Sequence, residues 1–140
     1  IGAKYKNYCS DMSRTIFLGT ISQKEKNTYS NLIEAQKGAI KKASLGMKLS
    51  ELDKDTRKSL GEHSSYFIHS LGHGLGVEIH EKPSFSEESK NKIAENQVFT
   101  IEPGVYFPGK FGLRIEDTTV FSGKLKRLTK SNKELVKIKI

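Results

Sequence analysis

The sequence predicts an α+β fold, in which helices are grouped in one part of the chain and strands in the rest. Three observations predict it. Ser22-Gln-Lys-Glu25 is a capping box that opens a helix over residues 22–44. A second helical pattern covers residues 50–60. Strand-like alternation of apolar and polar residues fills the first 19 residues and resumes from Tyr66 beyond Val120, without repeats or low-complexity linkers.

The first predicted element is a β-hairpin. Residues 1–5 form one strand, residues 6–7 the turn, and residues 8–19 the returning strand. Because side chains alternate between the two faces of a strand, one face of the returning strand gathers several polar side chains. These are Cys9, Asp11, Ser13 and Thr15.

The two helices carry recognisable boundary residues. Gly46 is suited to end the first helix, and Ser50 is the expected cap of the second, which Gly61 closes. Within the second helix, the apolar residues expected to contact the core are Leu52 and Leu60.

Two later strands, over residues 97–106 and 112–121, place acidic side chains on defined faces. In the first, Phe99, Ile101 and Val105 lie on one face, and Thr100 and Glu102 on the other. In the second, Leu113, Ile115 and Asp117 oppose Arg114, Glu116 and Thr118. Alternation alone is equally compatible with carboxylates that face water on the open side of an antiparallel sheet.

The densest chemical signal is a histidine cluster. Residues 69–81 contain three of the four histidines of the chain, namely His69, His73 and His80. Neutral imidazole is a common metal ligand and the usual proton carrier near pH 7. Glycines on both sides of His73 allow backbone or ligand to approach its ring. A glycine-rich turn with surface histidines is the alternative interpretation; the fourth histidine, His63, lies in a polar link and is expected to be exposed without a chemical role.

Composition limits the function classes. At 140 residues the chain suits one domain or most of one, and no apolar run approaches the length of a membrane helix. The net charge of +8 comes from lysines spread along the chain without interleaved aromatics, so a solvated surface is expected and no nucleic acid, with an anionic partner as the alternative. Cys9 is the only cysteine, which is typical of a reducing compartment and of a cytoplasmic protein.

Four acidic and histidine motifs, taken together in chain order, resemble those of a known family. Asp11 lies in Cys-Ser-Asp-Met-Ser-Arg-Thr and His73 in Gly-His-Gly; Glu102 of Glu-Pro-Gly follows His73 by 29 residues, and Glu116 of Arg-Ile-Glu-Asp follows Glu102 by 14. The set resembles the Xaa-Pro peptidases, prolidase and aminopeptidase P, of the pita-bread metallopeptidase family. The resemblance implies a curved antiparallel sheet covered by helices, with the site on its concave face.

The resemblance implies a metal site made of Asp11, His73, Glu102 and Glu116. Asp11 and Glu116 would bridge two divalent ions, and His73 and Glu102 would complete the shell of the first ion. Carboxylates with one imidazole suit Mn²⁺ or Co²⁺, with Zn²⁺ or Fe²⁺ as alternatives. Two such ions would supply hydroxide at neutral pH for hydrolysis of an Xaa-Pro bond in a proline-containing dipeptide or longer peptide.

The resemblance also assigns catalytic and substrate-binding roles. Glu102 would carry the proton from water to the leaving nitrogen, and His80 would bind the substrate carbonyl or the tetrahedral oxyanion. His69 would line the substrate pocket. Arg114 would orient a carboxylate or brace Glu116, with an ordinary structural ion pair to Asp117 or another neighbour as the alternative interpretation. A homodimer is compatible with the resemblance.

One ligand of the family pattern has no counterpart in the chain. It is an Asp eleven residues before the second one, a position that falls just before Ile1. We therefore expect residues 1–140 to be the C-terminal portion of a single catalytic domain, without the upstream part of that domain or any N-terminal domain. Such a fragment is expected to bind at most one ion and to be inactive or impaired.

Two other functions remain open at this point. A methionine aminopeptidase shares the Gly-His-Gly motif and a later His-Glu-x-Pro like that at His80, but lacks a histidine at the position of His69 and the Glu-Pro-Gly and Arg-Ile-Glu-Asp forms seen here. A non-catalytic pita-bread module that binds peptides, histones or RNA would usually have substituted metal ligands, whereas all four matched here are intact.

Overall fold

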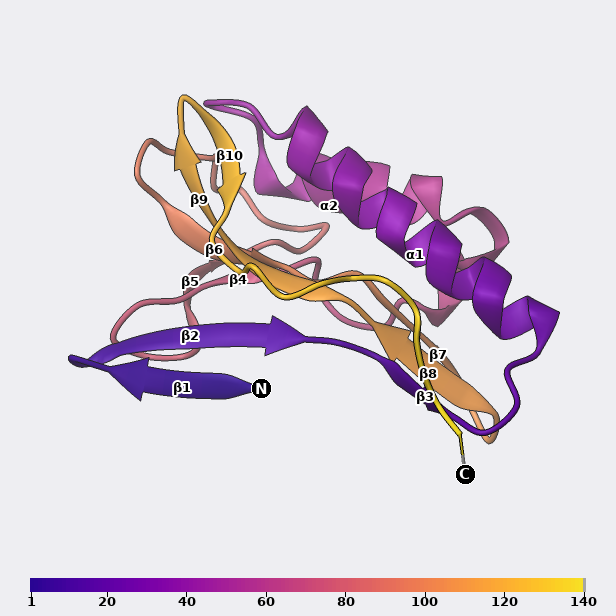
Figure 1. Cartoon of the computed structure of the whole chain (residues 1–140). Helices are drawn as coiled ribbons and strands as arrows, with labels where there is room; N and C mark the ends of the chain where they lie inside the picture. The colour runs from indigo at the N-terminus through magenta and orange to yellow at the C-terminus, as the bar shows by residue number, and fades with distance from the viewer. Residues whose placement is uncertain (140) are drawn as a thin grey trace.

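A curved, mainly antiparallel sheet covered on one face by two helices forms the body of the molecule (Figure 1). The computed structural model describes residues 1–139. The sheet has the strand order β1-β2-β9-β6-β4-β5, with β10 paired to β9. Its strands are β1 (Gly2–Tyr5), β2 (Tyr8–Ser13), β4 (His73–Gly74), β5 (Glu81–Ser84), β6 (Val98–Ile101), β9 (Glu116–Ser122) and β10 (Lys124–Arg127). The predicted α+β class is confirmed.

Both predicted helices are present, but two predicted boundary residues are wrong: Ser50 does not cap the second helix, and the first ends at Lys42 with Ala43 as its C-cap, before Gly46. The helix α1 (Gln23–Lys42) has the expected capping box, in which the Ser22 hydroxyl accepts a hydrogen bond from the Glu25 N–H. The helix α2 (Leu49–Ser59) begins one residue before the predicted cap, Ser50, and its N-cap residue has no capping side chain. Leu49 is completely buried, and its N–H donates to the Asn91 carbonyl at 3.0 Å. Tertiary packing of Leu49 therefore sets the start of α2.

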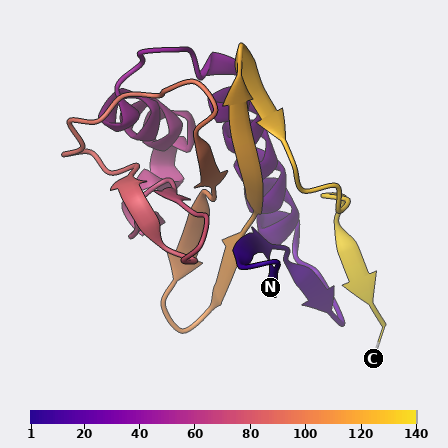
Figure 2. The ribbon, with the colours of Figure 1, turned by 90° about the vertical axis from the view of Figure 1, so that its left-hand side faces the viewer.

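Three predicted strands are each divided in two. The strand predicted over residues 8–19 splits into β2 and β3 (Ile16–Leu18), and β3 leaves the main sheet to pair in parallel with β11 (Val136–Ile138), as Figure 2 shows. The strands predicted over 97–106 and 112–121 both break as well, because β7 (Gly104–Phe107) and β8 (Phe111–Arg114) form a hairpin of their own. Glu102 and Glu116 consequently lie where the chain leaves and re-enters the main sheet.

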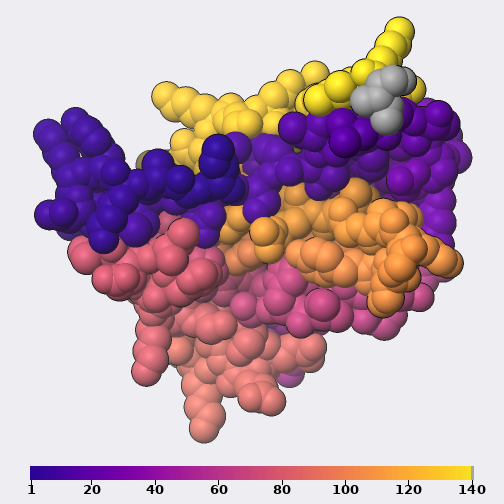
Figure 3. Space-filling model, turned by 90° about the horizontal axis from the view of Figure 1, so that it is seen from below, coloured from indigo at the N-terminus to yellow at the C-terminus, as the bar shows by residue number. Residues whose placement is uncertain are grey.

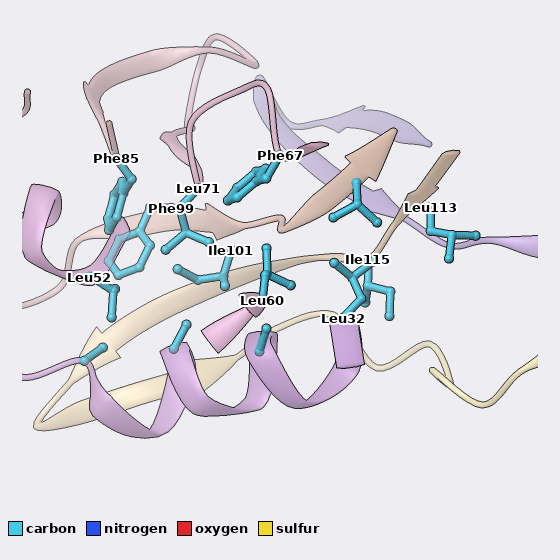
Figure 4. Close-up of a cluster of buried hydrophobic side chains, with 14 of the residues drawn as sticks. Leu32, Leu52, Leu60, Phe67, Leu71, Phe85, Phe99, Ile101, Leu113 and Ile115 are labelled. Atoms are coloured by element: carbon cyan, nitrogen blue, oxygen red, sulfur yellow. The ribbon is translucent and has the colours of Figure 1, made fainter. Parts of the chain in front are cut away.

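The core fills the space between the helices and the sheet (Figure 4). Leu52 and Leu60, predicted to contact it, are 0% and 1% exposed. Burying such a side chain contributes about 1.5–3 kcal/mol relative to leaving it exposed. The other buried side chains labelled in Figure 4 are Leu32, Phe67, Leu71, Phe85, Phe99, Ile101, Leu113 and Ile115. Within residues 1–139, no helix is long and apolar enough to cross a membrane.

The β1–β2 hairpin forms a lobe at one end of the molecule, seen in indigo in Figure 3 beside the pink segment that follows β4. The Cys9 N–H joins the two by donating to the Gly76 carbonyl at 2.7 Å. His63 does not stand in a solvated link as predicted. It belongs to the 3₁₀ helix η1 (Gly61–Tyr66) and is half-buried, because its ring packs edge-on against Phe107 with centroids 5.6 Å apart.

Candidate metal centre

The four predicted ligands come from four consecutive strands of the sheet. Asp11 lies on β2, Glu116 begins β9, Glu102 directly follows β6, and His73 begins β4. His73 Nε2 is 3.3 Å from Glu102 Oε1 and 3.8 Å from Asp11 Oδ2. Donor atoms of His73, Glu102 and Glu116 all lie within 4.8 Å of one another. Strand order thus brings together residues that are more than 100 positions apart in the sequence.

The ring of His73 is turned so that Nε2 faces the carboxylates. Its Nδ1 is 3.0 Å from the Gly74 carbonyl, which can only accept, so Nδ1 carries a proton and Nε2 is the nitrogen that points toward the carboxylates, as a metal ligand would. The neighbouring glycines permit this placement. A Cβ on Gly72 would lie 2.0 Å from the Thr100 carbonyl oxygen, and one on Gly74 would lie 2.6 Å from that of Lys82.

Hydroxyl groups hold the two glutamates. The completely buried Thr100 hydroxyl accepts from the His73 N–H at 3.0 Å and donates to Glu102 Oε1 at 3.1 Å. The Ser13 hydroxyl donates to Glu116 Oε2 at 2.6 Å. Both hydroxyls lie two residues from a predicted ligand on the same strand face, which is the signal that identifies them in the sequence.

Arg114 is linked to Glu116 indirectly, through the hydroxyl of Ser13. Its Nε donates to the Ser13 hydroxyl at 3.0 Å, and that hydroxyl in turn donates to Glu116. The alternative of an Arg114–Asp117 ion pair is wrong, because Asp117 faces the opposite side of the strand. There it pairs with Arg14 at 2.7 Å and Lys133 at 3.1 Å.

The two glutamates favour protonation in the metal-free chain. Burial, followed by the charge of Glu116, raises the pKa of Glu102 to about 8. Burial also raises the pKa of Glu116, with a further contribution from the charge of Asp11. Three carboxylates and one imidazole, with no lysine or arginine paired directly to Glu102 or Glu116 among residues 1–139, suit a divalent cation.

The remaining predicted site residues line one cavity of about 560 Å³ with His73 and Glu102; they are His69, His80 and Arg114. The centroids of the His80 and His73 rings are 4.3 Å apart. His69 donates from Nδ1 to the Ser70 carbonyl and accepts at Nε2 from the Tyr106 hydroxyl, both at 2.9 Å. Burial lowers the pKa of His69, so its ring is neutral near pH 7. No sequence signal pointed to Tyr106, which contacts His69 from the β7–β8 hairpin.

Fold and site together define a metallopeptidase-type centre. Residues 1–122 match the sequence profile of metallopeptidase family M24, and the chain belongs to that family. It is similar to an Xaa-Pro dipeptidase of Pyrococcus furiosus, with 45% identity over 139 residues, which cover 97% of this chain and 40% of that protein. The chain therefore spans about 40% of the length of this relative.

Solved structures establish the pita-bread fold. An X-Pro aminopeptidase from Thermotoga maritima MSB8 superposes with a TM-score of 0.92 at 38% identity, over 98% of this chain and 40% of that one. The N-terminal domain of the FACT complex subunit SPT16 from Eremothecium gossypii gives a TM-score of 0.90 over 99% of this chain and 35% of that one. At 22% identity this second likeness shows the fold alone.

Proposed function

We propose that the protein containing this chain is a metal-dependent hydrolase of Xaa-Pro peptide bonds, acting on a dipeptide or on the N-terminus of a longer peptide. The observation that carries the proposal is the convergence of His73, Glu102 and Glu116 within 4.8 Å, on a chain that belongs to family M24. The similarity to an Xaa-Pro dipeptidase and an X-Pro aminopeptidase supports the choice of substrate.

The donors of this chain fit divalent ions of intermediate hardness, with Mn²⁺ or Co²⁺ preferred and Zn²⁺ or Fe²⁺ as alternatives. Asp11 and Glu116 are the proposed bridging ligands of a dinuclear site, and His73 and Glu102 complete the shell of one ion. Bound there, the ions would polarise the scissile carbonyl and lower the pKa of water toward about 7.

The side chains that line the cavity have separate roles in proton transfer, oxyanion stabilisation and substrate binding. Glu102 accepts the proton of the attacking water and transfers it to the leaving proline nitrogen. Thr100 binds Oε1 of Glu102 and leaves its other oxygen for that transfer. His80 stands on the rim beside His73, where it donates to the oxyanion that develops on the substrate carbonyl. His69 and Arg114, which line the same cavity, contact the substrate.

The chain as given should bind one ion well and hydrolyse little. Asp11, His73, Glu102 and Glu116 supply a full set of donors for one ion. A second ion would have only the bridging carboxylates Asp11 and Glu116. Two divalent ions carry four positive charges, whereas the three carboxylates of this chain supply only three negative charges.

Calorimetric titration with Mn²⁺ or Co²⁺, combined with hydrolysis of Ala-Pro, tests the proposal. We expect one tight site on this chain, and metal-dependent cleavage of Ala-Pro by the protein that contains it. Two tight sites with full turnover on this chain would contradict the one-ion assignment. Cleavage of Met-Ala without cleavage of Ala-Pro would instead indicate a methionine aminopeptidase, and metal binding without cleavage of either a binding module.

A further inference from the structure

Gln36, in the middle of α1, reaches from the helix layer to the two strands that carry the glutamates. Its side chain is completely buried. The amide nitrogen donates to the Ile101 carbonyl at 2.9 Å and to the Ile115 carbonyl at 3.4 Å. These two residues immediately precede Glu102 and Glu116.

These contacts lie where the pairing between β6 and β9 ends. The residue pairing between β6 and β9 ends at Ile101 and Asp117, and from there the chain diverges into the β7–β8 hairpin. Beyond this point the regular ladder is interrupted, and next to Glu102 and Glu116 the backbone is joined through the Ile115 N–H, which donates to the Pro103 carbonyl at 3.3 Å. The amide group of Gln36, which holds both carbonyls, adds a link between the two strands where their regular pairing is interrupted.

A partly buried lysine, Lys133, determines which way the Gln36 amide points. Lys133 Nζ lies 2.8 Å from Gln36 Oε1 and 3.1 Å from Asp117 Oδ2. An ammonium group only donates, so the amide oxygen must face Lys133 and the NH₂ group must face the two carbonyls. Arg14 continues the network, donating to Asp117 Oδ1 at 2.7 Å and to the Glu116 carbonyl at 2.6 Å.

We propose that Gln36, oriented by Lys133, is a positioning residue that sets the separation of Glu102 and Glu116 from behind the sheet. It touches neither carboxylate and acts through the backbone of the residues before them. The link to metal binding rests on the proposed function, whereas the link to the spacing of the strands does not.

The test compares Gln36→Met with a matched control in the same helix. Methionine keeps the length of the side chain and removes both amide donors. Ala39→Gly, three residues further along α1, weakens the same buried helix without touching the network. Lys133→Met provides a second variant, which leaves Gln36 in place but releases the orientation of its amide.

We expect Gln36→Met to weaken Co²⁺ binding by about 10- to 100-fold, the range found when an outer partner of a metal ligand is lost. The visible absorption spectrum of bound Co²⁺ should change as well, because it reports coordination geometry. Lys133→Met should produce the same changes at smaller amplitude. Ala39→Gly should lower the midpoint of urea unfolding and leave affinity and spectrum close to those of the unmodified chain.

Unchanged Co²⁺ affinity and spectrum in both Gln36→Met and Lys133→Met would overturn the proposal, as would equal losses in Ala39→Gly. If Gln36→Met does not fold, Lys133→Met against the control decides. A crystal structure of the metal-free variant gives an independent reading. A changed separation of Glu102 and Glu116 in that structure would support the positioning role of Gln36, and an unchanged separation would refute it. This result does not depend on metal binding, so it remains decisive even if the unmodified chain binds no Co²⁺ and the proposed function fails.

Discussion

Glu116 and Asp117 are neighbours in β9, yet the fold treats their charges in opposite ways. Asp117 is completely buried and faces three cationic side chains, Arg14, Lys133 and Arg127. Glu116 is 3% exposed on the other face, where its neighbours include Glu102 and Asp11. On one side of the strand the counter-charge is built from the protein's own residues. On the other side the described residues leave room for a cation from outside.

The comparison separates a structural carboxylate from ligand carboxylates without any reference to the motif. Burying an ion is unfavourable unless a partner lies close. Around Asp117 that partner is permanent, so removing either member should cost stability. Around Glu102 and Glu116, burial, followed by repulsion from the neighbouring carboxylates, raises the pKa of both groups. Four predictions test this difference: three substitutions in order of decreasing effect, and then the dependence on pH.

The largest expected effect is on turnover. In the protein that contains this chain, Glu102→Gln should lower kcat for Ala-Pro by about 10²- to 10⁴-fold while retaining at least one metal ion, because the amide keeps an oxygen donor but accepts no proton. Glu88→Gln, at an exposed position, is the matched control. An unchanged kcat in Glu102→Gln would exclude Glu102 as the base.

On the opposite face, Asp117→Asn should destabilise the chain by about 3–5 kcal/mol, since it leaves buried cations without their carboxylate. Urea denaturation of the metal-free chain at pH 7 measures this. A loss smaller than that caused by an exposed Asp→Asn change would mean that the cations around Asp117 find other partners.

Glu116→Gln should instead increase the stability of the metal-free chain in the same urea denaturation experiment. It removes one of the mutually repelling carboxylates and keeps an amide oxygen to accept from Ser13, so the metal-free chain should gain up to about 1 kcal/mol. Metal binding should be lost in this variant. Parallel destabilisation by Glu116→Gln and Asp117→Asn would break the comparison between the two faces.

The last prediction is a dependence of stability on pH. Because the pKa of Glu102 is about 8 in the metal-free fold and near the model-compound value of 4.5 when unfolded, the folded chain keeps a proton that the unfolded chain loses in this interval. Stability without metal should therefore fall as pH rises from about 4.5 to about 8. Metal binding at pH 7 should release protons, measurable by calorimetry in buffers of different ionisation heat; no buffer dependence would contradict the raised pKa.

Much of the fold followed from local pattern. The capping box at Ser22, the core positions Leu52 and Leu60, and the faces of the strands depend on neighbouring residues, and the structure agrees with them. Where long-range packing decides, local pattern failed. The burial of Leu49 moved the start of α2 away from Ser50, and the separate β7–β8 hairpin interrupted strands that alternation had joined.

The candidate site shows the same division. The motifs placed Asp11, His73, Glu102 and Glu116 in one set, and the geometry brings their side chains together. Among their supports, Thr100 and Ser13 carry a local signal, because each shares a strand face with a ligand, but Gln36 does not. Gln36 is a polar residue in mid-helix whose two carbonyl partners lie 65 and 79 positions away, and no local periodicity encodes contacts of that range.

The bonds of Arg14 have a consequence for how the molecule is made. Its guanidinium donates to the carbonyls of Ser131 and Asn132, 117 and 118 positions later in the chain. At translation rates of about 5–20 residues per second, the ribosome needs roughly 6 to 24 s to reach those partners. For most of that time β9, the partner strand of β2, has not been made either, because it begins at Glu116. Because the apolar core includes Phe121 and Leu125, the core and the contacts of Arg14 are completed almost together, late in synthesis. A chain released before Ser131 would therefore lack the carbonyls that hold Arg14 next to Asp117.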